Sequence, residues 1–412
     1  MKKVLSIVTV IMTLVSIQSR ADEGMWLPML IKRLNYQDMQ KHGLQLTAEE
    51  IYSVNNSSLK DAIVALNGGS CTAETISEKG LLLTNHHCAF GVIQDNSLPE
   101  HDYLTDGFWA MAMKQELHAK NMSASYLIEM RDVTDDILSE ISITLSGEER
   151  SKAVRAAIQA VTEKVKGEVE EHYDVRVKGF FEGNEYYLFV YETFRDLRLV
   201  GAPPSSIGKY GGDTDNWMWP RHTGDFSLLR VYMGEDGKPA DYSESNIPYK
   251  PKHFLPISIS GVEKGDYTMI MGYPGSTDRY LSSYGVKQQL DFRQPSVVKI
   301  REQRLALLKE DMNSSAAIRI KYASKYAQVS NYWKYFIGQQ RGLKRLKVQD
   351  QKKELEDEFD AWVNKKPERK EIYGNVTKEW ASGFENDSKT ILFRTYFGEC
   401  IFASEATLMG WR

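Results

Sequence analysis

The sequence predicts a mixed β and α protein, with a strand-rich domain first and a helical domain after it. Two observations carry this prediction. Between residues 61 and 88, and again from 186 to 232, short apolar runs alternate with turn residues, which is typical of strands. After about Tyr284 the composition changes to long charged segments with helical periodicity.

The expected elements follow in chain order. Short helical patterns open the first domain at residues 28–34 and 47–52. Strands are expected at residues 62–66, 71–76, 81–84, 186–194, 197–200, 226–232 and 267–271. An alanine-rich helix is expected between the two groups of strands, at residues 146–167. The second domain is expected to contain helices at residues 298–310, 316–347 and 351–363.

Length and composition are those of a folded protein with more than one domain. The chain has 412 residues, and 42% of them are hydrophobic, which is enough for sizeable cores and excludes wholesale disorder. The formal net charge of −4 shows no basic excess, so the sequence argues against a nucleic-acid partner. Three cysteines are too few for a disulfide scaffold or a multi-cysteine metal cluster. These features favour a large enzyme.

The first residues have the pattern of a secretory signal. Lys2 and Lys3 precede an apolar run at residues 4–17, and small residues flank Arg20 at the end of the segment. This pattern predicts cleavage after Ala21 and a periplasmic, secreted or cell-surface location, where disulfides form. An uncleaved membrane anchor is the alternative. No later segment has an apolar run long enough to span a membrane.

A histidine pair next to a cysteine is the first candidate for chemistry. The strands at 71–76 and 81–84 are expected to form a hairpin, which brings Cys71 close to Cys88, 17 positions later. A disulfide between them would stabilise the fold by about 3 kcal/mol and fix the backbone that carries His87. A catalytic base needs such fixing, because its imidazole must stay within hydrogen-bond reach of a nucleophile.

An aspartate at the start of an apolar strand is the second candidate. Asp225 precedes the apolar run at 226–232 and follows a glycine- and tryptophan-rich loop. A carboxylate at the mouth of a strand can hold an imidazole N–H, select its tautomer and stabilise the imidazolium.

Both segments resemble those of the trypsin-like serine peptidases. The longer motifs at residues 84–88, 211–225 and 271–280 narrow the resemblance to the bacterial family related to dipeptidyl-peptidases 7 and 11. The resemblance runs from about Gly24 to at least Lys347. It implies that His87, rather than His86, is the catalytic histidine and that Asp225 is its orienting acid.

The same resemblance implies an architecture and an activity. The fold would be a trypsin-like antiparallel double β-barrel, interrupted in its second barrel by an α-helical domain that covers the cleft. Residues 1–21 would be the signal peptide, 22–283 the barrel domain and 284–412 the helical domain. The family removes dipeptides from oligopeptides with free N-termini, needs no metal or other cofactor, and is generally homodimeric.

Four residues match the family's substrate-binding positions. Asn216, Trp217 and Arg221 lie in the tryptophan-rich loop, and Asn331 corresponds to an asparagine of the helical domain. Their implied role is to hold the substrate's N-terminal end. An asparagine carbonyl suits this role, because it accepts a hydrogen bond from an α-ammonium group without burying a charge.

The nucleophile is not found. In this family the serine lies in a Gly-x-Ser-Gly turn after the helical domain, and these 412 residues contain no such sequence. We therefore expect the chain to be the N-terminal part of a longer protein and to lack peptidase activity by itself. The pocket that selects the penultimate side chain, apolar or acidic, is expected in the other part, as is any partner of Cys400.

Several alternatives stay open from the sequence. The protein could be an inert exported peptide-binding protein on the same fold, or a trypsin-like endopeptidase. His86, His87 and Cys88 could belong to a zinc site completed by His101 or Cys71. Trp217 and Trp219 could be core aromatics rather than substrate contacts.

Overall fold

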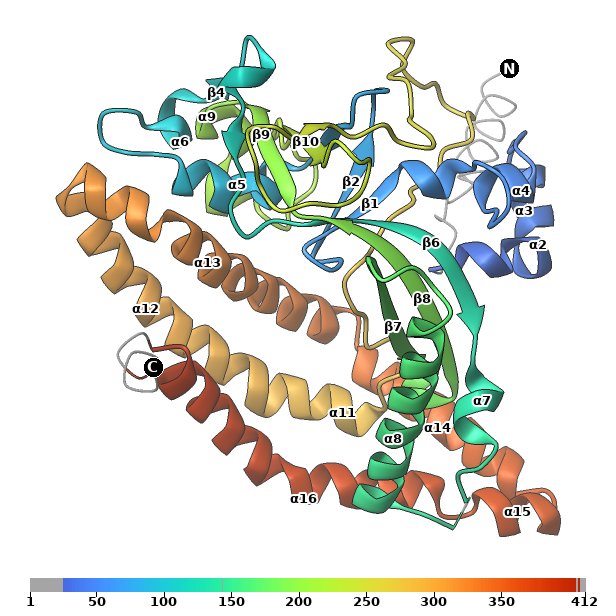
Figure 1. Ribbon diagram of the computed structural model, residues 1–412. Helices are drawn as coiled ribbons and strands as arrows, with labels where there is room; N and C mark the ends of the chain where they lie inside the picture. The colour runs from blue at the N-terminus through green and yellow to red at the C-terminus, as the bar shows by residue number, and fades with distance from the viewer. Residues whose placement is uncertain (1–24, 143, 405–406, 408–412) are drawn as a thin grey trace, which may run out of the picture. The chain divides into compact units, whose positions relative to one another are not determined.

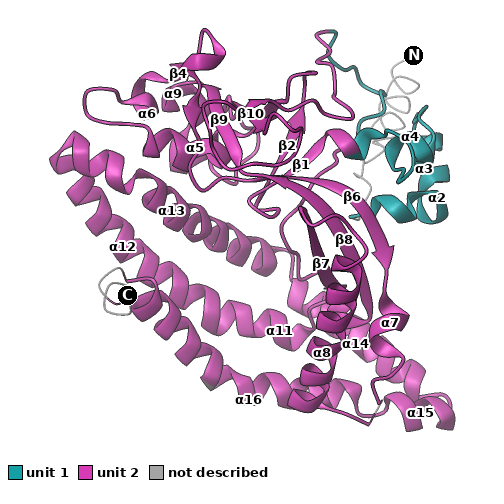
Figure 2. Ribbon diagram, in the orientation of Figure 1, with its two compact units in different colours: residues 1–60, 260–269 teal, residues 61–259, 270–412 magenta. Residues whose placement is uncertain are grey.

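The computed structural model describes residues 25–142, 144–404 and 407, so the predicted signal segment and its cleavage site lie outside the described residues. The chain divides into two compact units, one of Met1–Lys60 with Ser260–Met269 and one of Asp61–Ile259 with Ile270–Arg412 (Figure 2). No helix in the described part of the chain has both the length and the apolar character needed to cross a membrane.

The described part of the first unit is built from short helices. Among them are α2 (Ile31–Leu34), α3 (Tyr36–Lys41) and α4 (Ala48–Ile51). Helix α4 begins with a capping box in which Thr47 and Glu50 satisfy each other's backbone N–H groups. The helical patterns predicted at 28–34 and 47–52 are therefore confirmed.

The second unit contains one antiparallel sheet of eleven strands among the described residues, in the main order β4-β9-β10-β3-β2-β1-β6-β8-β7 (Figure 1). In addition, β11 pairs with β10 and β5 pairs with β9. The strands are β1 (Ile63–Leu66), β2 (Cys71–Thr75), β3 (Leu81–Thr84), β4 (Phe108–Trp109), β5 (Leu117–His118), β6 (Ala124–Asp132), β7 (Tyr173–Phe180), β8 (Glu185–Phe194), β9 (Asp196–Ala202), β10 (Ser227–Met233) and β11 (Ile247–Pro248).

Six of the seven predicted strands are present, with ends that differ by one or two residues. The prediction at residues 267–271 is wrong, because this apolar run pairs with no strand in the described part of the chain and Ile270 is fully exposed. Five strands were not predicted: β4, β5, β6, β7 and β11. Buried side chains of β3, β9 and β10, such as Leu82, Leu199 and Leu229, belong to one large core.

Helices of this unit cover the sheet at two places. Helix α5 (His86–Asp95) follows β3 directly, and its apolar residues Ala89, Val92 and Ile93 join the large core. Helix α8 (Gly147–Lys166), predicted at 146–167, packs beside β7 and β8 in a second core (Figure 1). The remaining short helices before residue 283 are α6 (Tyr103–Asp106), α7 (Thr134–Leu138), α9 (Ser205–Gly208) and α10 (Gly212–Asp215).

From Ser283 onward the described chain is almost entirely helical. The helices are α11 (Ser283–Gln288), α12 (Gln294–Ser314), α13 (Ala316–Arg345), α14 (Val348–Asn364), α15 (Pro367–Tyr373) and α16 (Val376–Tyr396). Helices α12 and α13 lie side by side, joined by Ser315, whose hydroxyl accepts a hydrogen bond from the N–H of Ile318 (Figure 1). The mixed β and α fold predicted from the sequence is therefore confirmed.

Candidate active site

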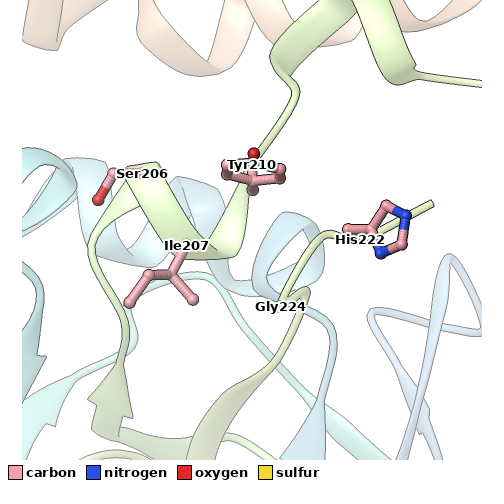
Figure 3. A pocket seen from close by; sticks show the side chains of 5 residues that line it. All are labelled: Ser206, Ile207, Tyr210, His222 and Gly224. Atoms are coloured by element: carbon pink, nitrogen blue, oxygen red, sulfur yellow. The ribbon is translucent and has the colours of Figure 1, made fainter.

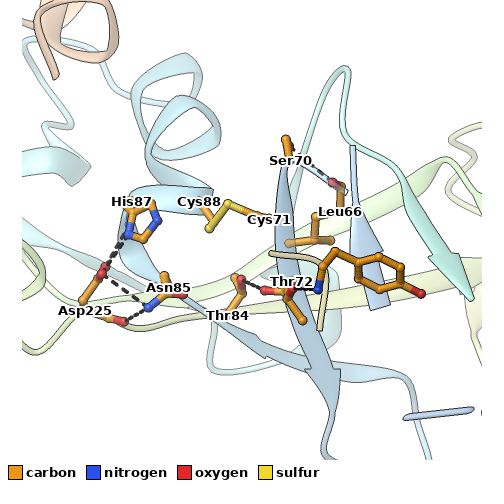
Figure 4. Close-up of a disulfide and its surroundings, with 10 residues drawn as sticks. Leu66, Ser70, Cys71, Thr72, Thr84, Asn85, His87, Cys88 and Asp225 are labelled. Atoms are coloured by element: carbon orange, nitrogen blue, oxygen red, sulfur yellow. Dashed lines mark hydrogen bonds and ion pairs between the residues drawn. A yellow bond between two sulfur atoms is a disulfide. The ribbon is translucent and has the colours of Figure 1, made fainter. Parts of the chain in front are cut away.

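The candidate catalytic histidine lies in the first turn of helix α5. His87 was expected just past the strand at 81–84, and the structure does end β3 at Thr84; the helix that begins at His86 was not predicted. The next residue, Cys88, forms a disulfide with Cys71 of β2, with 6.1 Å between the two Cα atoms (Figure 4). The disulfide therefore ties the start of α5 to the β2–β3 hairpin.

Asp225 lies against this helix start, although it is 138 residues away in sequence. Its Oδ2 is 2.7 Å from His87 Nδ1, and its Oδ1 accepts a hydrogen bond of 3.0 Å from the backbone N–H of His87 (Figure 4). The two residues meet because β10, which begins two residues after Asp225, pairs with β3 in the register Ser227 to Thr84. The sheet therefore brings together the pair that the sequence singled out.

A third side chain, which the sequence analysis missed, completes this arrangement. Asn85 Nδ2 lies 3.1 Å from the backbone carbonyl of Asp225 and 3.3 Å from its Oδ2. The only signal for it in the sequence is its place directly before the two histidines. With this amide beside it, the carboxylate has donors around both of its oxygens.

The electrostatics favour an ionised carboxylate beside the imidazole. Burial alone would raise the pKa of Asp225, but the hydrogen bonds and the charge of His87 outweigh burial and lower the pKa below its ordinary value. The side chain of His87 is 68% exposed, whereas that of Asp225 is 21% exposed. An accessible imidazole whose Nδ1 is held by a carboxylate can accept and return protons at its other nitrogen.

His86 has a different environment from its neighbour. Its side chain is buried, and burial lowers its pKa below the ordinary value although the nearby Asp225 acts in the opposite direction. The ring packs against Phe90 and lies so close to Gly208 that a Cβ there would fall 2.3 Å from its Cδ2. His86 is therefore a neutral packing residue, while His87 is open to solvent.

The four predicted substrate-binding residues form one hydrogen-bonded group. Asn216 Nδ2 donates to Asn331 Oδ1 at 2.9 Å, and the Trp217 indole N–H donates to the Asn331 carbonyl at 3.0 Å. Arg221 Nη1 donates to Asn216 Oδ1 at 3.3 Å. The structure thus joins the tryptophan-rich loop to helix α13.

The two tryptophans of this loop are not core residues. Trp217 is 54% exposed and Trp219 is 91% exposed. The ring of Trp217 also lies 5.0 Å from that of Tyr335, one helical turn beyond Asn331 on α13. This placement removes the alternative in which both tryptophans belong to the core.

A shallow pocket of about 330 Å³ opens beside Asp225. Its lining residues are Ser206, Ile207, Tyr210, His222 and Gly224 (Figure 3). His222 lines this pocket, and Gly224 directly precedes Asp225. The pocket therefore lies between the segment that follows β9 and the residues that lead into Asp225.

The residues around His87 do not provide the ligands of the zinc site considered as an alternative in the sequence analysis. In the described part of the chain, Cys71, His87 and Cys88 are the only three potential ligands within reach of one another. Both sulfur atoms are taken by the disulfide, so they cannot act as the thiolates that zinc requires. Cys400, in contrast, is an exposed free thiol.

Comparison with known proteins gives consistent results. The family model of peptidase S46 matches residues 21–410. The chain is 48% identical over 397 residues to dipeptidyl-peptidase 7 of Capnocytophaga gingivalis, covering 96% of this chain and 55% of that protein. It is 46% identical over 386 residues to an Asp/Glu-specific dipeptidyl-peptidase of Flavobacterium psychrophilum, covering 93% and 54%.

A solved structure extends the comparison to the fold. Porphyromonas endodontalis DPP11 in complex with the dipeptide Arg-Asp matches with a TM-score of 0.84 and 36% identity, covering 93% of this chain and 55% of that chain. The chain spans about half the length of the curated relatives it matches.

Proposed function

The chain belongs to the peptidase S46 family, and on that premise we propose that it carries the histidine and the aspartate of an exported serine-type dipeptidyl aminopeptidase. The observation that carries this proposal is the 2.7 Å contact between His87 Nδ1 and Asp225 Oδ2. The substrates would be oligopeptides with a free N-terminus, and the products dipeptides.

In the proposed reaction His87 acts first as a base and then as an acid. Its Nε2 takes the proton of a serine hydroxyl while the serine oxygen attacks the second peptide carbonyl. The protonated imidazole then gives this proton to the leaving amine, and a water molecule hydrolyses the acyl-enzyme by the same route. Asp225 stabilises the imidazolium through Nδ1. The serine is proposed to lie in a Gly-x-Ser-Gly turn, a pattern absent from these 412 residues.

The Asn216–Asn331 group is proposed to bind the α-ammonium of the substrate. Each amide oxygen accepts one hydrogen bond in the structure, from Arg221 or from Asn216, and a carbonyl oxygen has a second lone pair. A cation with three donors can use these free positions. The separation between this group and His87 would then limit cleavage to the second peptide bond.

The remaining parts of the proposal concern the whole protein. We propose that the antiparallel sheet belongs to a trypsin-like barrel domain at residues 22–283, and that residues 284–412 are part of a helical domain over its cleft. The relatives support a peptidase, and the signal-like first 21 residues are the support for a periplasmic, secreted or cell-surface location. The resemblance described above supports a homodimer.

Dipeptide release provides the test. The full-length gene product should release dipeptides from a chromogenic peptide with a free N-terminus and should lose activity when the α-amine is acetylated. Equal activity on both substrates would instead indicate an endopeptidase. The 412-residue chain alone should be inactive, and turnover by this purified chain would contradict the assignment of the nucleophile to another segment.

A further inference from the structure

We infer that Gln94 is a positioning residue that fixes the distance between His87 and Asn331. This inference rests on the proposed function, because it concerns how the site for the substrate's N-terminus is held relative to the catalytic imidazole. Gln94 touches neither site. It acts through the two helices that carry them, α5 and α13.

The contact itself is a side-chain bond to a helix backbone. Gln94 Oε1 accepts a hydrogen bond of 2.6 Å from the backbone N–H of Ser324, the ninth residue of α13. The preceding residue, Ala323, is buried in the same core as Ala89 and Val92 of α5. A small side chain at this crossing lets the two helices approach closely enough for Gln94 to reach the backbone.

The spacing along both helices is the same. His87 lies seven residues before Gln94 on α5, and Asn331 lies seven residues after Ser324 on α13. Seven residues of α-helix correspond to about 10.5 Å. The Gln94–Ser324 bond therefore joins two rigid arms of about equal length, one ending near the catalytic histidine and the other at the N-terminus-binding asparagine.

These arms close into a ring through the loop that carries Asp225. Asn331 is hydrogen-bonded to Asn216 and Trp217, and the same loop continues to Asp225, which is hydrogen-bonded to His87. Three of the non-covalent joints of this ring are His87–Asp225, Asn331 with the loop, and Gln94–Ser324. The first two consist of proposed functional residues, so Gln94 is the joint that can be removed without touching either site.

A second contact supports the same helix from nearby. Arg319 of α13 forms an ion pair with Asp102, which also caps helix α6 by accepting from the N–H of Thr105. Helix α13 is thus attached to the segment of α5 and α6 at two points, before its Asn331 end meets the loop. Without the Gln94 side chain, only the Asp102–Arg319 ion pair of these two contacts remains. The crossing of α5 and α13, which lies nearer to His87 and Asn331, is then held less firmly.

The test is Gln94→Leu in the full-length gene product, compared with Gln94→Glu, which keeps an acceptor oxygen. Gln94→Leu should lower kcat for dipeptide release by about ten- to a hundredfold, because small misplacements of a bound substrate have effects of this size. KM should change little, since the Asn216–Asn331 group is intact. Gln94→Glu should restore most of the activity, and Gln328→Leu, an exposed position on α13, should behave like the wild type.

Hydrolysis of p-nitrophenyl acetate separates positioning from damage to the active site. This small ester has no ammonium group, so its hydrolysis should stay within about twofold of wild type in Gln94→Leu. Equal losses on both substrates, or no loss of dipeptide release, would overturn the inference. If Gln94→Leu does not fold, Arg319→Met carries the same comparison with the same two outcomes. A wild-type protein that releases no dipeptides contradicts the proposed function instead.

Discussion

Replacing Asp225 with asparagine tests the proposed chemistry most directly. In the structure Asp225 Oδ1 accepts from the backbone N–H of His87, so the oxygen of an asparagine should take this position. Its NH₂ group then faces His87 Nδ1, in place of the carboxylate oxygen that now lies 2.7 Å away. An amide donor there forces the imidazole proton onto Nε2, the nitrogen that must accept the proton of the serine.

The expected effect of Asp225→Asn follows from this wrong tautomer. In serine peptidases a wrong tautomer of the catalytic histidine lowers kcat by about 10⁴-fold, which corresponds to roughly 5–6 kcal/mol of activation free energy. The assay is dipeptide release by the full-length gene product at saturating substrate, with folding checked by urea denaturation. The exposed Asp241→Asn serves as the matched control. A loss smaller than tenfold in a folded Asp225→Asn protein would refute the reasoning.

Three further predictions concern stability. Burial holds the pKa of His86 below its ordinary value, so on lowering the pH the unfolded chain binds a proton at this histidine before the folded chain does. The contribution of His86 to the free energy of unfolding should therefore be complete above about pH 6.5 and should decrease as the pH falls below it. Urea titrations from pH 5 to 8 should show a weaker pH dependence for His86→Gln than for the wild type. Replacing Cys71 and Cys88 with serine should lower the free energy of unfolding by about 3 kcal/mol in the same titrations, and an unchanged midpoint would contradict this. Gly208→Ala should lower the free energy of unfolding by about 1–3 kcal/mol, because the added methyl group would collide with the His86 ring. Gly91→Ala in α5 has open space around it and should raise the free energy of unfolding by roughly 0.5–1 kcal/mol. The urea midpoints of the two variants should therefore move in opposite directions.

Local patterns predicted the strands around the site but not helix α5, which carries His87. The hairpin of β2 and β3 is marked by apolar runs on either side of a glycine turn, and its geometry brings Cys71 to Cys88. The pairing of β10 with β3 is a long-range property that was not predicted; the resemblance to known peptidases anticipated only its result, the contact between Asp225 and His87. Three helices after residue 283, α12, α13 and α14, were predicted because their periodicity extends over many turns, whereas α11, α15 and α16 were not predicted.

Other features could not be predicted, for physical reasons. The run at 267–271 has the composition of a strand, but a strand also needs a partner for its backbone groups, which local sequence does not reveal. The burial of His86 depends on its packing against Gly208, 122 positions away in sequence. The bond between Gln94 and Ser324 depends on how two helices cross, and no local pattern encodes such a crossing.

The hydrogen bond from the His87 N–H to Asp225 has a consequence for how this protein can change. The second N–H of helix α5 is one of the groups that an N-cap side chain usually satisfies, yet Asn85 at the cap position does not satisfy it. Asp225, which lies just before strand β10, therefore serves as the cap of a helix that begins 139 residues earlier. One carboxylate thus supports both the fold and the proposed reaction, so mutation and selection cannot adjust the two independently at this position.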